Sequence, residues 1–154
     1  MTMPFTQKER MLLEDLKSHE QVCISKYNAY ANQAQDPELK QLFKTYAGQE
    51  QQHMNTLNQI LSGQVPNMGQ QQGQQPAQTA QAGDAAGMKN QTDAALCNDV
   101  LMTEKYVSGS YNTTIFEFRD TNIRQALNHI QKEEQQHGEG IFNYMQKKGL
   151  YNVQ

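Results

Sequence analysis

The tetrapeptide EQQH occurs twice in this chain, at residues 50–53 and again, unchanged, at residues 134–137. Each copy follows another glutamate by 30 residues, because Glu20 precedes Glu50 and Glu104 precedes Glu134. The two copies belong to a longer repeat with an offset of 84 residues and no gap. Other identities in it include Asp15 with Asp99, Tyr27 with Tyr111, Asn28 with Asn112, Asp36 with Asp120 and Gln41 with Gln125. A unit present only twice indicates a duplicated supersecondary element and not a solenoid.

Each repeat unit has the apolar periodicity of two helices. Apolar residues recur every three or four positions, as one face of an α-helix requires. The pattern predicts helices over about 7–34, 38–61, 89–118 and 122–148. Asp36-Pro37-Glu38 is typical of a helix start, and Asp120 occupies the same repeat position. Lys147-Lys148-Gly149 is typical of a helix end. Each unit is therefore expected to be a helical hairpin.

A stretch of different composition separates the two hairpins. Residues 62–88 are rich in Gln, Gly, Ala and Pro and nearly lack large apolar side chains. Such a segment cannot bury enough surface to hold one conformation, but it is long enough to run the length of a bundle. The predicted fold class is all-α, a single domain over 1–154. It is a four-helix bundle of two repeated hairpins, about 7–61 and 89–148, joined by a long crossover linker, about 62–88.

Ionisable residues interrupt the apolar stripes where leucine or isoleucine is expected. They are Glu20, Glu50, His53, Glu104, Glu134 and His137. Glu20 lies 15 residues before the turn near residue 35 and Glu50 lies 15 residues after it, so both are about 22 Å from the bend. The second hairpin repeats this spacing about position 119. Two packed hairpins should therefore bring four carboxylates and two imidazoles together at mid-bundle.

Four carboxylates buried in a dry core need protons, cations or water to balance their charge. Burying one unpaired charge costs several kcal/mol. Two divalent ions would balance the four charges. One Glu from each of two helices, with Glu-x-x-His from each of the other two, is the ligand pattern of di-iron and di-manganese carboxylate bundles. Oxygen and imidazole ligands suit iron or manganese, whereas zinc usually takes fewer ligands with more sulfur or nitrogen. The six residues are thus candidate metal ligands for two ions of iron or manganese.

Metal-free interpretations remain open for these positions. The six side chains could form a polar core layer satisfied by mutual hydrogen bonds and water. Tyr27 and Tyr111 lie two turns from Glu20 and Glu104. They are either ordinary core tyrosines or donors of hydrogen bonds to the opposing carboxylates, a support that metal ligands commonly need.

Composition and the remaining residues argue against several classes of protein. The net charge is −3 and no stretch is densely basic, which does not indicate a nucleic-acid or anionic-membrane surface. No run of about 18 apolar residues predicts a membrane span, and residues 1–8 lack the pattern of a secretory signal. Cys23 and Cys97 have no metal-type spacing and are expected to be reduced thiols on or near the core. His19 and His129 fall outside the apolar stripes and are expected at the surface.

The order Glu, Glu-x-x-His, Glu, Glu-x-x-His resembles that of the ferritin-like superfamily, which includes bacterioferritin and rubrerythrin. This resemblance implies that the six residues are metal ligands. The segment from about Asp93 to Tyr151 also resembles the spore coat protein F family. The residues that carry this second likeness are Asp99-Val100-Leu101, Lys105, Ser110-Tyr111-Asn112, Glu133-Glu134, Tyr144-Met145-Gln146 and Gly149-Leu150-Tyr151. The chain lacks the rubredoxin-like cysteine module of rubrerythrin.

The second resemblance implies a structural or protective role in the spore coat, after synthesis in the mother-cell cytoplasm. The partners it implies are other coat proteins or further copies of this chain, and it supplies no catalytic residues. The expected function is that of a coat-associated ferritin-like protein with a dinuclear carboxylate metal site. Two alternatives stay open: a di-iron or di-manganese oxidoreductase acting on peroxide or Fe(II), and a metal-free coat interaction module.

Overall fold

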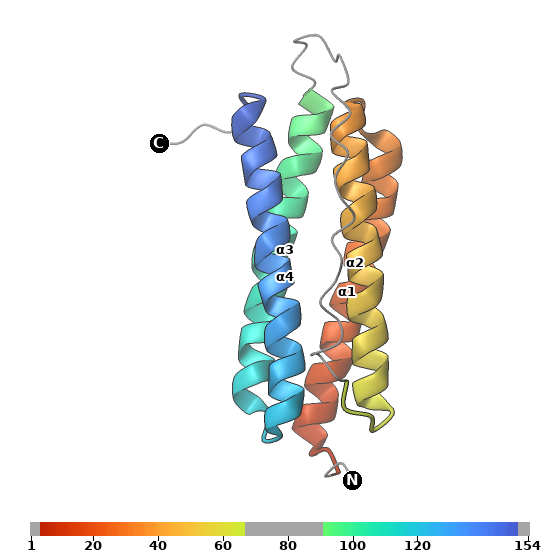
Figure 1. The fold of residues 1–154 in the computed structure, drawn as a ribbon, viewed down its shortest axis with the longest axis vertical. Coiled ribbons are helices and arrows are strands. Elements are labelled where there is room, and N and C mark those ends of the chain that lie inside the picture. Colours follow the sequence, from red (N-terminus) through yellow and green to blue (C-terminus); the bar gives the residue numbers. More distant parts are fainter. Residues whose placement is uncertain (1–3, 67–90, 151–154) are drawn as a thin grey trace.

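The computed structural model describes residues 4–66 and 91–150, which form four α-helices and no strand (Figure 1). α1 spans Gln7–Gln33, α2 Pro37–Leu61, α3 Gln91–Glu117 and α4 Thr121–Lys147. The predicted bounds agree with these to within one residue, except at the start of α3. There, residues 89 and 90 lie outside the described part of the chain. Within the two described ranges, the prediction of an all-helical fold with four helices is confirmed.

Local chemistry explains where the helices begin and end. Asp36 and Asp120 cap α2 and α4: Asp36 accepts a hydrogen bond from one N–H group of the first turn and Asp120 accepts from two. A capping box that the sequence analysis did not identify starts α1. In it, the hydroxyl of Thr6 accepts from the N–H of Glu9 at 3.0 Å, and the carboxylate of Glu9 accepts from the N–H of Thr6 at 2.9 Å. Gly149, with a φ of 70°, ends α4 in the left-handed conformation that glycine adopts without strain.

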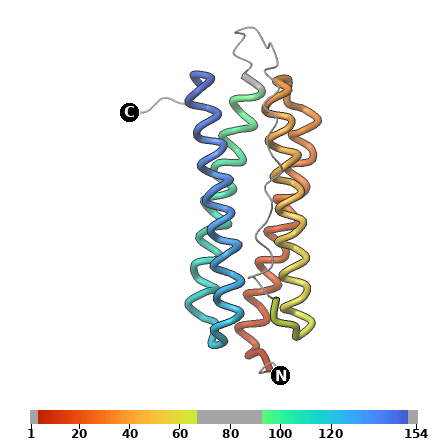
Figure 2. Tube along the Cα trace, in the orientation of Figure 1, coloured from red at the N-terminus to blue at the C-terminus, as the bar shows by residue number. Residues whose placement is uncertain are grey.

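The helices pair as two antiparallel hairpins. α1 packs on α2 and α3 packs on α4, while α1 contacts α3 and α2 contacts α4 across the bundle. The chain course shows that α2 ends at one end of the bundle and α3 begins at the other (Figure 2). This is the arrangement that a long crossover connection requires. The predicted linker itself lies, beyond residue 66, outside the described residues.

The core consists of two apolar clusters with a polar layer between them. One cluster includes Leu13, Leu57 and Ile130, and the other includes Phe43, Val100 and Met145. Burying a side chain of this size stabilises the fold by about 1.5–3 kcal/mol. The apolar clusters therefore supply the stability of the bundle, and the layer between them holds the ionisable side chains.

Contacts at both ends of the bundle hold the hairpins in register. At one end, Asp93 of α3 accepts hydrogen bonds from the N–H groups of Gln35 and Asp36 at 2.9 and 3.0 Å. At the other end, Arg119 donates to the buried carboxylate of Glu9 at 3.1 and 3.2 Å. Because each contact joins one hairpin to the other, the two fix how the polar residues of the two halves align.

Candidate metal centre

All six predicted residues converge at one level of the bundle. Glu20 projects from α1, Glu50 and His53 from α2, Glu104 from α3, and Glu134 and His137 from α4. None of these side chains is more than 3% exposed. Contacts join the hairpins: Nδ1 of His53 lies 3.5 Å from Oε1 of Glu134, and Nδ1 of His137 lies 3.7 Å from Oε2 of Glu50. The equal spacing of the four glutamates from the two turns, with each histidine three residues beyond a glutamate, therefore does bring the six residues together.

Two overlapping groups of four residues have the geometry to hold a metal ion each. One group is Glu20, Glu50, His53 and Glu134, and the other is Glu50, Glu104, Glu134 and His137. Within each group, one candidate ligand atom from every residue lies within 4.8 Å of the others. Glu50 and Glu134 belong to both groups, whereas each group has its own histidine and its own second glutamate. The arrangement follows the internal repeat, with two shared carboxylates between two equivalent positions.

Both imidazoles present Nδ1 to the carboxylates and Nε2 to the outside of the cluster. Nε2 of His53 lies 2.7 Å from Oε1 of Glu133, and Nε2 of His137 lies within hydrogen-bond distance of Oε1 of Gln49. Neither partner was predicted from the sequence, although each immediately precedes the glutamate of an EQQH motif. Partners of this kind fix the ring orientation and raise the basicity of a histidine ligand. The two halves differ here, because one imidazole contacts a carboxylate and the other an amide.

Two tyrosines support the outer carboxylates crosswise between the hairpins. The hydroxyl of Tyr111 on α3 donates to Oε1 of Glu20 on α1 at 2.6 Å. The hydroxyl of Tyr27 on α1 donates in the same way to Oε2 of Glu104 on α3. Both tyrosines are no more than 2% exposed. Of the two interpretations left open for them, the structure favours donors to opposing carboxylates.

Burial makes the cluster electrostatically costly. It is the main cause that raises the pKa of Glu20 to about 8, with the charge of Glu50 adding to the effect. Burial also raises the pKa of Glu104, and it raises that of Glu134 well above the usual range, where the charges of Glu104 and Glu50 contribute. Burial therefore shifts the titration of these three carboxyl groups toward the protonated form when no cation balances them.

The other half of the charge balance involves Glu50 and the imidazoles. Burial would raise the pKa of Glu50, but the interactions with the imidazoles of His137 and His53 outweigh it and hold that pKa well below its usual range. Burial would lower the pKa of each imidazole, but the contacting carboxylates raise both values well above the ordinary one. The cluster can thus balance its charge with protons on imidazoles and carboxyls, and divalent cations could replace those protons.

Buried carboxylate oxygens without hydrogen-bond partners indicate whether metal ions fit the six candidate ligands. Among the described residues, five buried carboxylate oxygens have no hydrogen-bond partner: Glu20 Oε2, Glu50 Oε2, Glu104 Oε1 and both oxygens of Glu134. Buried polar atoms without partners are rare in folded proteins because each costs about 1–3 kcal/mol. All five belong to the two four-residue groups. The donor set therefore fits divalent ions, which would use these oxygens as ligands.

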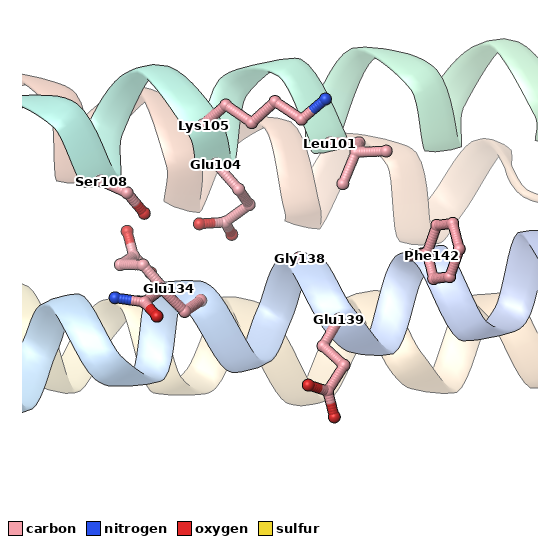
Figure 3. Close-up of a pocket in the computed structure, with 9 residues that line it drawn as sticks. Leu101, Glu104, Lys105, Ser108, Glu134, Gly138, Glu139 and Phe142 are labelled. Carbon is pink, nitrogen blue, oxygen red and sulfur yellow. The ribbon is translucent and has the colours of Figure 1, made fainter.

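A pocket of about 520 Å³ between α3 and α4 reaches this layer (Figure 3). Glu104 and Glu134 line it, and their carboxylates point toward each other across the gap between the helices. Ser108 and Gly138 also contribute to its walls. The candidate centre is thus buried in the bundle but adjoins an opening on the side of the second hairpin.

Other sequence predictions concern residues outside the cluster. Cys23 and Cys97 are free and buried, at 1% and 0% exposure, as expected for reduced core thiols. His19 and His129 are both partly exposed, and His129 lies 3.4 Å from Glu133. None of the helices in the described ranges is long and apolar enough to cross a membrane.

Comparison with known proteins connects the second hairpin to one family. Residues 92–154 match the Coat F domain, a region that contains α4 and nearly all of α3 and is less than half of the chain. No curated protein and no solved structure matches the chain. The match supports the likeness to spore coat protein F in the region where the sequence showed it.

Proposed function

We propose that this chain is a coat-associated protein of bacterial spores, ferritin-like in architecture, whose mid-bundle centre binds two ions of iron or manganese. Its role is structural or protective, and its partners are other coat proteins or further copies of the chain. The Coat F match over residues 92–154 supports the location. The observation that carries the metal proposal is the pair of four-residue groups that share Glu50 and Glu134.

Each candidate residue has a distinct role in holding the ions. Glu20 and His53 would bind one ion, Glu104 and His137 the other, and the shared carboxylates would lie between the two. When bound, the ions supply positive charge, and iron or manganese adds the capacity for one-electron redox chemistry. Tyr111 and Tyr27 orient the outer carboxylates by hydrogen bonds. Glu133 and Gln49 hold the imidazole rings with Nδ1 facing inward.

Elemental analysis after loading with Fe(II) under anaerobic conditions, or with Mn(II), tests this proposal. We expect about two ions per chain in the wild-type protein. The double variant Glu50→Gln with Glu134→Gln should stay helical and lose both ions, because each substitution removes a carboxylate that both positions share. A matched control, Glu14→Gln with Asp15→Asn, removes two exposed carboxylates from α1 and should bind as the wild type does. Equal metal contents in the double variant and the wild type would show that the assigned ligands are wrong.

A second candidate function is an oxidoreductase that acts on peroxide or Fe(II) at the same centre. The pocket that reaches Glu104 and Glu134 favours it, because redox turnover needs access for a small reactant. Consumption of hydrogen peroxide by the loaded protein, compared with the loaded Glu14→Gln/Asp15→Asn control and the metal-free double variant, separates the two functions. Turnover that follows metal content favours the enzyme, and a loaded but inert protein favours the structural role.

A further inference from the structure

The pocket between α3 and α4 is bounded at its inner end by two candidate ligands. Glu104 and Glu134 are 3% and 0% exposed, yet both are among the residues that line the pocket. Figure 3 shows their carboxylates directed into the space between the two helices, whereas Lys105 extends away from it. The pocket is thus continuous with the layer that would hold the ions.

The oxygens at this inner end point independently to a ligand. Oε1 of Glu104 and both oxygens of Glu134 have no hydrogen-bond partner. Oε1 of Glu134 lies 3.2 Å from Nδ1 of His137, within ion-pair range but without hydrogen-bond geometry. A cation that arrived through the pocket would therefore meet acceptor atoms whose binding capacity is unused.

The internal repeat shows how the two hairpins differ at the positions that line this pocket. Gly138 and Ser108 line the pocket, and the residues 84 positions earlier are Met54 and Ile24. The Met54 side chain is 6% exposed and so is packed into the bundle, where Gly138 has no side chain. A Cβ on Gly138 would meet only Leu101 Cδ1, at 3.9 Å, which is an ordinary contact. At these two positions the second hairpin therefore has small residues where the first has large ones.

We propose that this pocket is the route by which a divalent metal ion reaches and leaves the centre. The inference rests on the proposed metal site and adds the path to it. Without such a route, exchange of a fully buried ion would require the packed helices to separate, which is a local unfolding step. With it, an ion can approach Glu104 and Glu134 while the bundle stays closed.

The variant Gly138→Met tests the route by placing in the second hairpin the residue that the first hairpin carries. Co²⁺ is the probe, since its visible absorption reports binding directly. Stopped-flow mixing gives the rate of uptake, and transfer of the ion to excess EDTA gives the rate of release. We expect both rates to fall at least about tenfold in the variant, while the number of ions bound per chain stays that of the wild type. Gly109→Met is the matched control, because Gly109 is exposed on α3 with open space around its Cβ position; its rates should equal those of the wild type.

The outcomes distinguish this inference from the proposed function. Equal Co²⁺ binding and equal exchange rates in the wild type, Gly138→Met and Gly109→Met would support the metal centre and refute the access route. If the wild type binds no Co²⁺, the proposed function fails, and the route fails with it. Should circular dichroism show that Gly138→Met does not fold, Ser108→Ile, also copied from the first hairpin, decides the question. Slower exchange with unchanged binding supports the route, and unchanged exchange refutes it.

Discussion

Replacing Glu20 by glutamine should stabilise the metal-free protein and weaken its stabilisation by metal. The carboxyl of Glu20 is 0% exposed, and its pKa is raised from 4.5 to about 8. Glutamine has nearly the same shape and carries no charge. Its amide oxygen can accept the hydrogen bond that Tyr111 now donates to Oε1 of Glu20. The substitution therefore removes the ionisable group and leaves the packing nearly unchanged.

The size of the stability gain expected for Glu20→Gln follows from the raised pKa of Glu20. Below pH 4.5 the carboxyl holds its proton in both the folded and the unfolded state, so the raised pKa has no effect on stability. As the pH rises, the unfolded state loses the proton first, and the fold is weakened by about 1.4 kcal/mol per pH unit until the folded pKa is reached. At pH 7 this cost is about 3 kcal/mol. Glu20→Gln removes it, so the variant should gain about 3 kcal/mol at pH 7 and almost nothing at pH 4.

Urea unfolding followed by circular dichroism measures both effects. In EDTA, the gain of Glu20→Gln over the wild type is compared at pH 4 and pH 7, with Glu14→Gln as the control at an exposed position of α1. In Mn²⁺ at about 100 times the dissociation constant, the wild type should gain about 2.7 kcal/mol for each ion bound, and the variant should gain less because one ligand is gone. A variant that at pH 7 in EDTA is no more stable than the wild type would refute the reasoning.

Two further predictions concern the packing around the centre and the end of the bundle. A Cβ on Gly140 would overlap the hydroxyl of Tyr46, a buried ring that stacks on His137 at 4.2 Å. Gly140→Ala should therefore lower the stability by about 1–2 kcal/mol. Gly48→Ala should raise it, because no atom lies within 4 Å of a Cβ at that position. Equal shifts of the melting temperature for the two variants would contradict this. Hydrogen bonds from Arg119 outweigh burial and lower the pKa of Glu9 to about 2. Because this pKa is depressed, Glu9 stabilises the fold above pH 4.5 and loses that effect as the pH falls toward 2. Urea unfolding of Glu9→Gln should show a loss of about 1–2 kcal/mol at pH 7, discounted for the exposed guanidinium, and none at pH 2; a loss that does not change with pH would rule out the ion pair as its cause.

Much of the fold could be predicted from the sequence because its determinants are local. Helix period, the caps at Asp36 and Asp120 and the stop at Gly149 depend only on residues a few positions apart. The position of Glu20 and Glu50 along the bundle axis also follows from counting residues to a turn, since the helical rise per residue is constant. These rules led to four helices with bounds close to the observed ones. They also placed six ionisable side chains in one layer, as the structure shows.

Only the tertiary structure decided which atoms meet within that layer. The crosswise bonds from Tyr27 and Tyr111, and the sharing of Glu50 and Glu134 between two groups, depend on how each helix is rotated toward its neighbours. That rotation results from packing both apolar clusters at once and is not a property of any one helix. The opening beside Gly138 arises in the same way. A repeat in the sequence can indicate that two halves correspond, but the gap is a property of their packed surfaces, because it is the space that neighbouring side chains leave unfilled.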